Sequence, residues 1–211
     1  MSTAALQVTD LNAWHGAAQA LFDVSLRVGP GELVVLQGLN GAGKSTLLQA
    51  LMGLCSRQTG RVQYAGQRLD GLPPHRRAQA GLGYVAEDRR LFGSLTVREN
   101  LHIAARGDVA ANRARVLALF PVLSQMLDRP ARQMSGGEQQ MLAIARTLMT
   151  APRLLLLDEP CEGIAPVLVA ALRDALLALK ADGLPMLVAE QNSILADRAD
   201  RVLTLVGGRL A

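Results

Sequence analysis

The stretch Gly38-Leu39-Asn40-Gly41-Ala42-Gly43-Lys44-Ser45 lies between an apolar run at residues 32–37 and a helical pattern at residues 44–52. Its glycines allow the backbone to fold around an anion with its N–H groups pointing inward, and the helix start adds partial positive charge. A lysine and a hydroxyl at the end of such a loop can reach terminal phosphates and a magnesium ion. The pattern therefore predicts a phosphate-binding loop between a strand and a helix.

A second pattern ends in two acids. The run Leu154-Leu155-Leu156-Leu157 is apolar enough to be a strand buried on both faces, and Asp158 and Glu159 follow it. The carboxyl end of such a strand lies beside the phosphate-binding loop in a parallel sheet. We therefore expect Asp158 to hold Mg²⁺, directly or through water, and Glu159 to polarise the attacking water.

A third pattern, Ser135-Gly136-Gly137-Glu138-Gln139, begins a predicted helix that reaches residue 150. Serine and glycine at a helix start present free N–H groups to an anion, although Ser135 could also be an ordinary N-cap. A chain that already has one phosphate-binding loop does not need a second anion site for the same molecule. The second site therefore has to serve another molecule if it is functional.

The remaining patterns predict the fold class. Strand patterns with tight turns occupy the first third of the chain, at residues 6–9, 21–27, 32–37 and 61–64. Helical periodicity follows at residues 95–127. After residue 136, helices alternate with strands at 153–158, 185–189 and 202–206, which predicts a parallel sheet with crossover helices. We expect a single α/β domain over residues 1–211, with a mainly parallel P-loop core, an antiparallel β lobe at the N-terminus and a helical subdomain near residues 88–135.

The composition argues against several classes of protein. No apolar run approaches the roughly 18 to 20 residues needed to cross a bilayer, and residues 1–10 lack the pattern of a secretory signal, so we expect the chain to stay in the cytoplasm. The net charge of +4 is spread along the chain without a block of like charge, which argues against nucleic-acid binding. Cys55, Cys161 and the three histidines are far apart, which argues against a metal cluster or a disulfide.

The order of the three motifs resembles the nucleotide-binding subunits of ABC transporters, over essentially the whole chain. The resemblance implies an ATPase that uses Mg²⁺ and dimerises head to tail, so that each ATP lies between one subunit's phosphate-binding loop and its partner's Ser135 segment. The implied catalytic residues are Lys44, Glu159 and Gln191, and the implied metal ligands are Ser45, Glu87 and Asp158. The implied nucleotide contacts are Gly38, Leu39, Asn40, Gly41, Ala42, Gly43, Lys44, Ser45, Thr46, Ser135, Gly136, Gly137 and Glu138, with Trp14 or His15 stacking on adenine.

Further segments resemble the ATPases of branched-chain amino acid importers, and importers of urea or short amides are similar too. These segments are YVAEDRRLF at residues 84–92, EGIAP at 162–166 and EQN at 190–192. Three residues depart from the general family pattern: Glu87 stands where most relatives have glutamine, Gln191 where most have histidine, and Ile164 where most have aspartate. Each departure changes the chemistry available at its position.

The resemblance also implies partners. These are two membrane permease subunits, a second copy or a paralogous ATPase subunit, and indirectly an extracytoplasmic solute-binding protein, with the chain peripheral on the cytoplasmic face of the membrane. We expect residues 88–96 to contact the permeases. Two alternatives belong to other classes: an ABC-type ATPase that acts on nucleic acid or ribosomes, and a small-molecule kinase in which residues 135–138 match by accident.

Overall fold

A mainly parallel sheet forms the centre of the computed structural model, which describes residues 5–191 and 193–211. Its strand order is β10-β9-β3-β8-β7-β6, and every pairing is parallel except that of β10 with β9. The strands are β3 (Leu33–Gln37), β6 (Leu82–Val85), β7 (Leu154–Asp158), β8 (Met186–Glu190), β9 (Arg201–Val206) and β10 (Arg209–Leu210). The predicted parallel core is confirmed.

A second, antiparallel sheet has the order β2-β1-β4-β5. Its strands are β1 (Leu6–His15), β2 (Ala18–Val28), β4 (Arg57–Tyr64) and β5 (Gln67–Arg68). The pairing of β1 with β2 shifts register three times, between Val8 and Leu11, between Leu11 and Ala13, and between Ala13 and Trp14. The antiparallel lobe at the N-terminus is therefore confirmed, and its first two strands are longer than the sequence pattern predicts.

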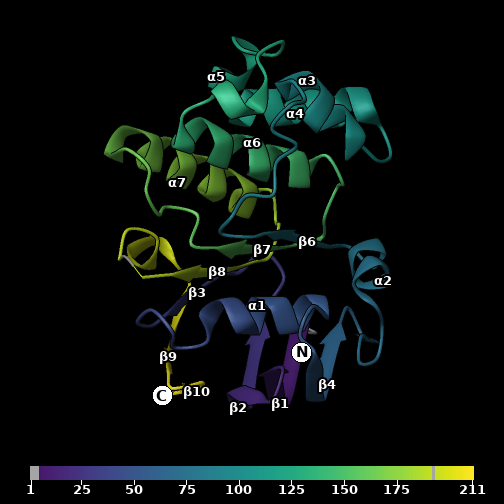
Figure 1. The fold of residues 1–211 in the computed structure, drawn as a ribbon, viewed down its shortest axis with the longest axis vertical. Coiled ribbons are helices and arrows are strands. Elements are labelled where there is room, and N and C mark those ends of the chain that lie inside the picture. The colour runs from purple at the N-terminus through teal and green to yellow at the C-terminus, as the bar shows by residue number, and fades with distance from the viewer. Residues whose placement is uncertain (1–4, 192) are drawn as a thin grey trace.

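The helices lie on both sides of the parallel sheet (Figure 1). They are α1 (Lys44–Met52), α2 (Pro74–Gln79), α3 (Val97–Ile103), α4 (Val109–Leu119), α5 (Pro121–Ser124), α6 (Gly136–Leu148) and α7 (Pro166–Ala181), with short 3₁₀ turns η1 (Ala131–Gln133) and η2 (Ala196–Arg198). Helix α1 lies between the two sheets, whereas α6 and α7 cover the opposite face and α3 to α5 lie beyond them (Figure 1). Among the described residues, no helix combines the length and apolarity that a membrane span requires.

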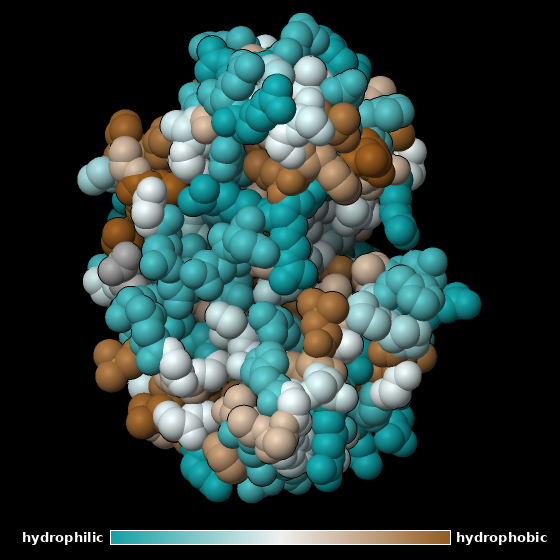
Figure 2. Space-filling view, in the orientation of Figure 1, coloured by the Kyte–Doolittle hydropathy of each residue, from teal (hydrophilic) through white to brown (hydrophobic). Residues whose placement is uncertain are grey.

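The side chains of the central strands point alternately into two hydrophobic cores. In β3, Leu33 and Val35 join the cluster with helices α3 to α7, whereas Val34 and Leu36 join the cluster with α1 and the antiparallel sheet. Successive side chains of a strand point to opposite faces, so a strand buried on both sides must be apolar throughout. The outer surface is different: hydrophilic side chains cover most of the face in Figure 2, and the apolar ones lie in separate groups.

The elements that were not predicted from the sequence include α2, β5, β6 and β10. Helix α2 begins at Pro74, and proline is well tolerated at the first helical position. This proline was the available sign of a helix start. Strand β6 contains Gly83, where an added Cβ would lie 2.9 Å from side-chain atoms of both Pro152 and Thr147. Close packing, rather than strand propensity, therefore explains the glycine in β6.

Helix α2 carries a buried arginine that holds the end of α1. Arg77 is only 1% exposed, and its guanidinium donates to the carbonyl oxygens of Leu72 at 3.0 Å, Ala50 at 2.8 Å and Leu51 at 2.9 Å. The last carbonyls of a helix lack donors within the helix. This side chain supplies a donor to Leu51 and a further one to Ala50, whose carbonyl also accepts from the Gly53 N–H at 3.0 Å. Arg77 therefore joins α2 to the carboxyl end of the helix that follows the phosphate-binding loop.

Arg77→Ala is expected to lower the free energy of unfolding by about 2–4 kcal/mol, because buried carbonyl groups lose charged hydrogen-bond donors. Urea unfolding followed by circular dichroism measures this loss. Arg76→Ala is the matched control, since Arg76 is exposed and its side chain donates to Gln79 on the same helix. Its removal should change stability by no more than about 0.5 kcal/mol. Equal stabilities for the two variants would contradict the assigned role of Arg77.

Candidate functional site

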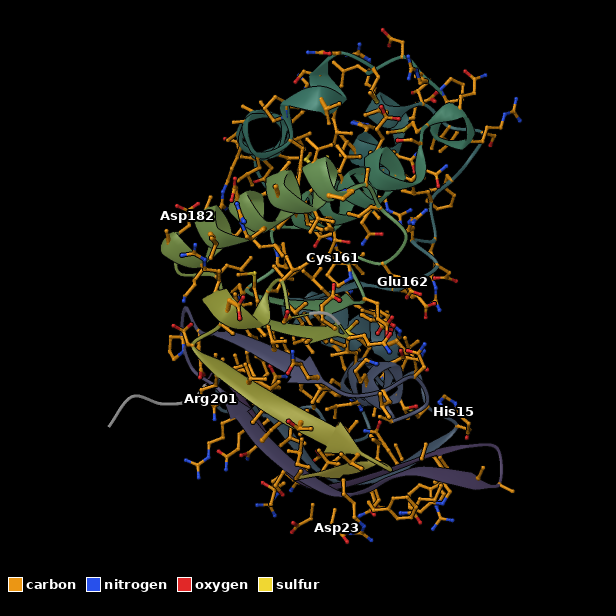
Figure 3. All side chains as sticks on the ribbon, turned by 90° about the vertical axis from the view of Figure 1, so that its left-hand side faces the viewer. His15, Asp23, Cys161, Glu162, Asp182 and Arg201 are labelled. Atoms are coloured by element: carbon orange, nitrogen blue, oxygen red, sulfur yellow. The ribbon has the colours of Figure 1, made fainter. Side chains whose placement is uncertain are left out.

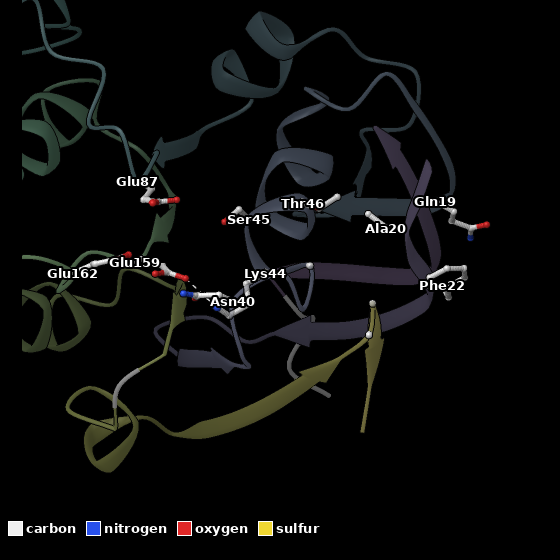
Figure 4. A pocket seen from close by; sticks show the side chains of 14 residues that line it. Gln19, Ala20, Phe22, Asn40, Lys44, Ser45, Thr46, Glu87, Glu159 and Glu162 are labelled. Carbon is white, nitrogen blue, oxygen red and sulfur yellow. Dashed lines mark ion pairs between the residues drawn. The ribbon is translucent and has the colours of Figure 1, made fainter. Parts of the chain in front are cut away.

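The predicted phosphate-binding loop joins β3 to α1 and borders a cavity of about 490 Å³. The lining residues come from both lobes and from the loops after β6, β7 and β9 (Figure 4). They are Gln19, Ala20, Phe22, Asn40, Gly41, Gly43, Lys44, Ser45, Thr46, Glu87, Glu159, Glu162, Gly207 and Gly208. The fold thus brings the loop, both predicted catalytic charges Lys44 and Glu159, and the predicted metal ligands Ser45 and Glu87 to one cavity.

The loop has the backbone of an anion cradle. Gly41 and Gly43 have φ angles of 79° and 105°, in the left-handed region that favours glycine. An added Cβ at Gly38 would lie 2.5 Å from the carbonyl oxygen of Leu205, so the loop packs directly on the strand β9. Within the described chain, α1 has Gly43 as its N-cap and no side chain bonded there, so its first N–H groups are left to a ligand. This geometry fits phosphate oxygens.

Lys44 is buried beneath the loop and bridges it to the acidic strand. Its Nζ donates to the carbonyl oxygen of Gly38 at 2.9 Å and to that of Leu39 at 3.3 Å. The same nitrogen forms an ion pair of 2.9 Å with Glu159 Oε1, drawn as a dashed line in Figure 4. Because the two side chains are 3% and 9% exposed, water screens this ion pair only slightly.

Asp158 lies at the end of β7, opposite the first turn of α1. Its carboxylate accepts hydrogen bonds from Ser45 Oγ at 2.9 Å and from the Tyr84 hydroxyl at 3.2 Å. Burial raises the pKa of Asp158, although the bonds from Ser45 and Tyr84 act against this shift. Glu87 lines the cavity and is near enough to Asp158 for its charge to raise the pKa of Asp158 further. A hydroxyl and carboxylates are hard oxygen ligands, so this donor set fits Mg²⁺.

Glu159 has a left-handed backbone conformation, and its carboxylate has hydrogen-bond partners in Lys44 and Glu162. Its φ is 46°, and this conformation is held because its N–H donates to the carbonyl oxygen of Ala189 at 2.9 Å. Burial acts to raise the pKa of Glu159, but hydrogen bonds from Glu162 and Lys44 outweigh it and lower the pKa. The same contact with Glu159 raises the pKa of Glu162 to about 7. Glu159 is therefore the ionised member of the pair, as a proton acceptor must be.

Cys161 and Glu162 lie on the loop that follows β7, between the parallel sheet and the helices above it (Figure 3). The Cys161 N–H donates to Oε1 of buried Glu190 at 2.8 Å. Glu162 was not predicted as a cavity residue. Glu162 could have been found from its position three residues after Glu159. The backbone forms a turn there, in which the Glu162 N–H donates to the Glu159 carbonyl oxygen at 3.1 Å.

Gln191 lies on the other side of the phosphate-binding loop. Together with Leu39, Asn40 and Ala42 it borders a neighbouring cavity of about 460 Å³, and Gly38 and Gly41 line it too. The same loop therefore borders both cavities, with Gln191 lining the second and Ser45 and Glu159 lining the first. Asn192, part of the same sequence motif, lies outside the described residues.

Ser135 and Glu138 form a capping box at the start of α6. The Ser135 N–H donates to Glu138 Oε2 at 2.7 Å, and the Glu138 N–H donates to Ser135 Oγ at 3.4 Å. Gly137 packs against Leu168 and Ile164. None of the residues Ser135–Glu138 is among those lining either loop cavity in the described chain. The fold therefore keeps the two anion-binding helix starts apart within one chain.

The structure does not bring Trp14 to the cavity. Its indole lies against the guanidinium of Arg57, whose Cζ is 4.5 Å from the ring centroid. The neighbouring His15 is closer to the site, since its Nε2 is 3.1 Å from the hydroxyl of Thr46. Phe22 from β2 lines the cavity itself and was missed. The register shifts in β1 explain the miss, because a shift of one residue reverses the face on which a side chain lies.

Comparisons with known proteins agree with this geometry. Residues 21–162 match the family model described as ABC transporter. The chain is 42% identical over 210 residues to the high-affinity branched-chain amino acid transport ATP-binding protein BraG of Pseudomonas aeruginosa, covering 97% of this chain and 90% of that protein. It is 37% identical over 212 residues to the probable branched-chain amino acid transport ATP-binding protein LivF of Archaeoglobus fulgidus, covering 98% and 90%.

Solved structures of ABC transporter cassettes are also similar to this chain. An ATP-binding cassette of an ABC transporter in its ADP conformation superposes with a TM-score of 0.87 at 26% identity, covering 99% of this chain and 90% of that one. A dimeric ABC transporter cassette, at 24% identity and a TM-score of 0.85, shows the shared fold. The family match, the two relatives and the phosphate-binding cavity lead to one conclusion: this chain belongs to the ABC transporter family, among its ATP-binding subunits.

Proposed function

We propose that this chain hydrolyses Mg·ATP on the cytoplasmic face of a membrane and thereby drives an ABC importer for branched-chain or similar hydrophobic amino acids. The observation that carries the proposal is the cavity that the loop, Lys44, Ser45, Glu87 and Glu159 line together, with Asp158 bonded to Ser45. Phosphoryl transfer needs positioning and charge stabilisation more than covalent help, and this set of groups supplies both.

Each side chain has a task that follows from its contacts. Ser45, Asp158 and Glu87 would hold Mg²⁺, which when bound neutralises phosphate charge. Lys44 donates to a terminal phosphate oxygen in place of Glu159, its present counter-ion. The carboxylate of Glu159, thus released, accepts a proton from the attacking water. Phe22 and His15 supply aromatic surface for adenine at the end of the cavity lined by Gln19 and Ala20.

The Ser135 segment serves a different molecule of ATP. Its capped helix start presents N–H groups to an anion but lies away from the loop cavities of its own chain. We assign it to the ATP held by a second subunit, which is either another copy of this chain or a paralogue. The working unit is then a head-to-tail dimer, in which the helical subdomain near residues 88–135 of one chain closes over the loop of the other.

Residues 88–96 are our candidate contact to the membrane permeases. Phe92 in this segment is 48% exposed, and the guanidinium of Arg146 lies 5.4 Å from its ring centroid. The solute is assigned from the names of the relatives, which transport branched-chain amino acids. Urea or short amides are the alternative solutes. A nucleic-acid-associated ATPase is the weaker alternative, because the basic residues are dispersed.

Deleting this chain from its cells should abolish most high-affinity uptake of labelled leucine, and uptake should return with the wild-type gene but not with Lys44→Ala. Transport measured at low micromolar leucine and, in parallel, with labelled urea separates the two classes of solute. Loss of urea uptake with normal leucine uptake would reassign the solute. Unchanged uptake of both would contradict the importer assignment.

Glu159→Gln is expected to bind ATP normally and to hydrolyse it about 10²–10⁴-fold more slowly, because the amide cannot accept the proton of the attacking water. Phosphate release gives the rate, and a fluorescent ATP analogue gives the affinity. Lys44→Ala is the contrasting variant, since it should weaken binding and turnover together. Normal turnover in the Gln variant would remove Glu159 from the role of base.

Gln191→Ala should reduce the hydrolysis rate by about 10²-fold or more with little change in ATP binding, because the active site loses one preorganised donor. Gln191→His should keep substantial activity, since a histidine can donate a hydrogen bond from the same place. The melting temperature of each variant is measured on the same preparation. A lower melting temperature with an unchanged rate would mean that Gln191 only stabilises the chain after β8.

A further inference from the structure

The guanidinium of Arg89 lies against the start of helix α6. Its Nε donates to Gln140 Oε1 at 3.0 Å, and its Nη1 is 3.4 Å from Gln139 Oε1. The same Nη1 would be 3.4 Å from a Cβ at Gly136, so any side chain at that position would touch the guanidinium. Arg89 is thus held by two neighbouring glutamines, directly beside the segment Ser135–Glu138.

Gln139 carries this contact into the chain that leads to Ser135. Its Nε2 donates to the carbonyl oxygen of Ala131 at 3.0 Å and to that of Met134 at 3.3 Å. Met134 directly precedes Ser135, so the glutamine links the guanidinium to the residue before the capping box. The position of the first turn of α6 therefore depends on a connected set of side-chain bonds that begins at Arg89.

Hydrogen bonds also hold the backbone of Arg89. Arg89 has a φ of 59°, its N–H donates to the Ala86 carbonyl at 2.9 Å, and its own carbonyl accepts from Arg146 Nη2 at 3.2 Å. Arg146 also belongs to α6. Helix α6 thus holds Arg89 at two different turns, through Gln139 and Gln140 at one and through Arg146 at the other. These bonds limit the directions that the Arg89 side chain can take.

The electrostatics of the helix start does not favour a cation at this place. The amino end of a helix carries partial positive charge, so a neighbouring guanidinium is electrostatically unfavourable there. An anion bound at the helix start would reverse the sign of this effect. The position and charge of Arg89 thus both fit a helix start that is held ready for phosphate.

We propose that Arg89 is a positioning residue, which fixes the first turn of α6 so that Ser135–Glu138 can bind the ATP held by the partner subunit's loop. The proposal rests on the dimer described under the proposed function. Arg89 also belongs to residues 88–96, the candidate contact to the permeases. It therefore gives that segment a direct side-chain connection to the shared nucleotide site.

The test measures ATP-dependent dimerisation in a Glu159→Gln background, by size-exclusion chromatography across a range of Mg·ATP concentrations. Arg89→Ala should raise the ATP concentration needed for half-maximal dimer by about tenfold, because two hydrogen bonds to the glutamines are lost. Arg89→Lys should recover little, since an ammonium cannot bond both glutamines in one plane. Ser135→Arg serves as the reference for a lost partner contact.

Arg90→Ala is the matched control. Arg90 also has a positive φ, of 48°, but its side chain is exposed and pairs with Asp88, two residues away. Its replacement should therefore change dimerisation by less than about twofold. Arg89→Ala should lower the melting temperature, because buried Gln140 loses a hydrogen-bond donor. ATP binding to the single chain should equal that of its parent, because Arg89 is not among the residues that line the loop cavity in the described chain.

The outcomes distinguish the shared-site dimer from the role of Arg89 within it. Absence of an ATP-dependent dimer in the Glu159→Gln parent would overturn the shared-site model, and the role of Arg89 with it. A dimer in the parent with equal ATP requirements for the Arg89→Ala and Arg90→Ala variants would overturn only the role of Arg89. Full recovery by Arg89→Lys would mean that charge alone matters, and a parallel loss of melting temperature and single-chain ATP binding would mean a purely structural role.

Discussion

The site depends on one constraint, the common direction of the parallel strands. The carboxyl ends of parallel strands lie at one edge of a sheet, so whatever follows β3, β6, β7 and β8 must gather there. The phosphate-binding loop follows β3, Glu87 follows β6, Asp158 and Glu159 close β7, and Gln191 follows β8. Residues more than a hundred positions apart, such as Ser45 and Asp158, meet because of this topology.

The charges at that edge do not balance within the protein. Lys44 faces Glu159 directly, while Glu87, Asp158 and Glu162 bring further carboxyl groups to the same region. A bare polyphosphate would meet repulsion from these acids, whereas a phosphate that arrives with a divalent cation brings the missing positive charge. Under the proposed function, the excess of carboxylates favours the metal complex of the nucleotide. The Lys44–Glu159 ion pair meanwhile keeps two buried charges from being left without partners.

The central strands and the phosphate-binding loop could be predicted because burial on both faces requires an unbroken apolar run, as in residues 154–157, and because glycine spacing marks the loop. Other features depend on contacts that no local pattern records. Gly83 sits in a strand because Pro152 and Thr147 leave no room for a side chain. Trp14 faces Arg57 because β1 shifts register beside it, so the aromatic surface at the cavity comes from Phe22 instead. The division near residues 88 and 135, and the role of each site residue, stay predictions.

The backbone at Glu159 has a consequence for how this protein can evolve. A φ of 46° costs a non-glycine residue roughly 1–3 kcal/mol, which the bond to Ala189 and the buried surroundings of the loop must offset. Glycine at this position would relieve the strain and delete the carboxylate in the same step. Glycine would also leave the buried ammonium of Lys44 without its counter-ion, which destabilises the fold. A substitution at residue 159 therefore cannot relieve the backbone strain without unpairing a buried charge.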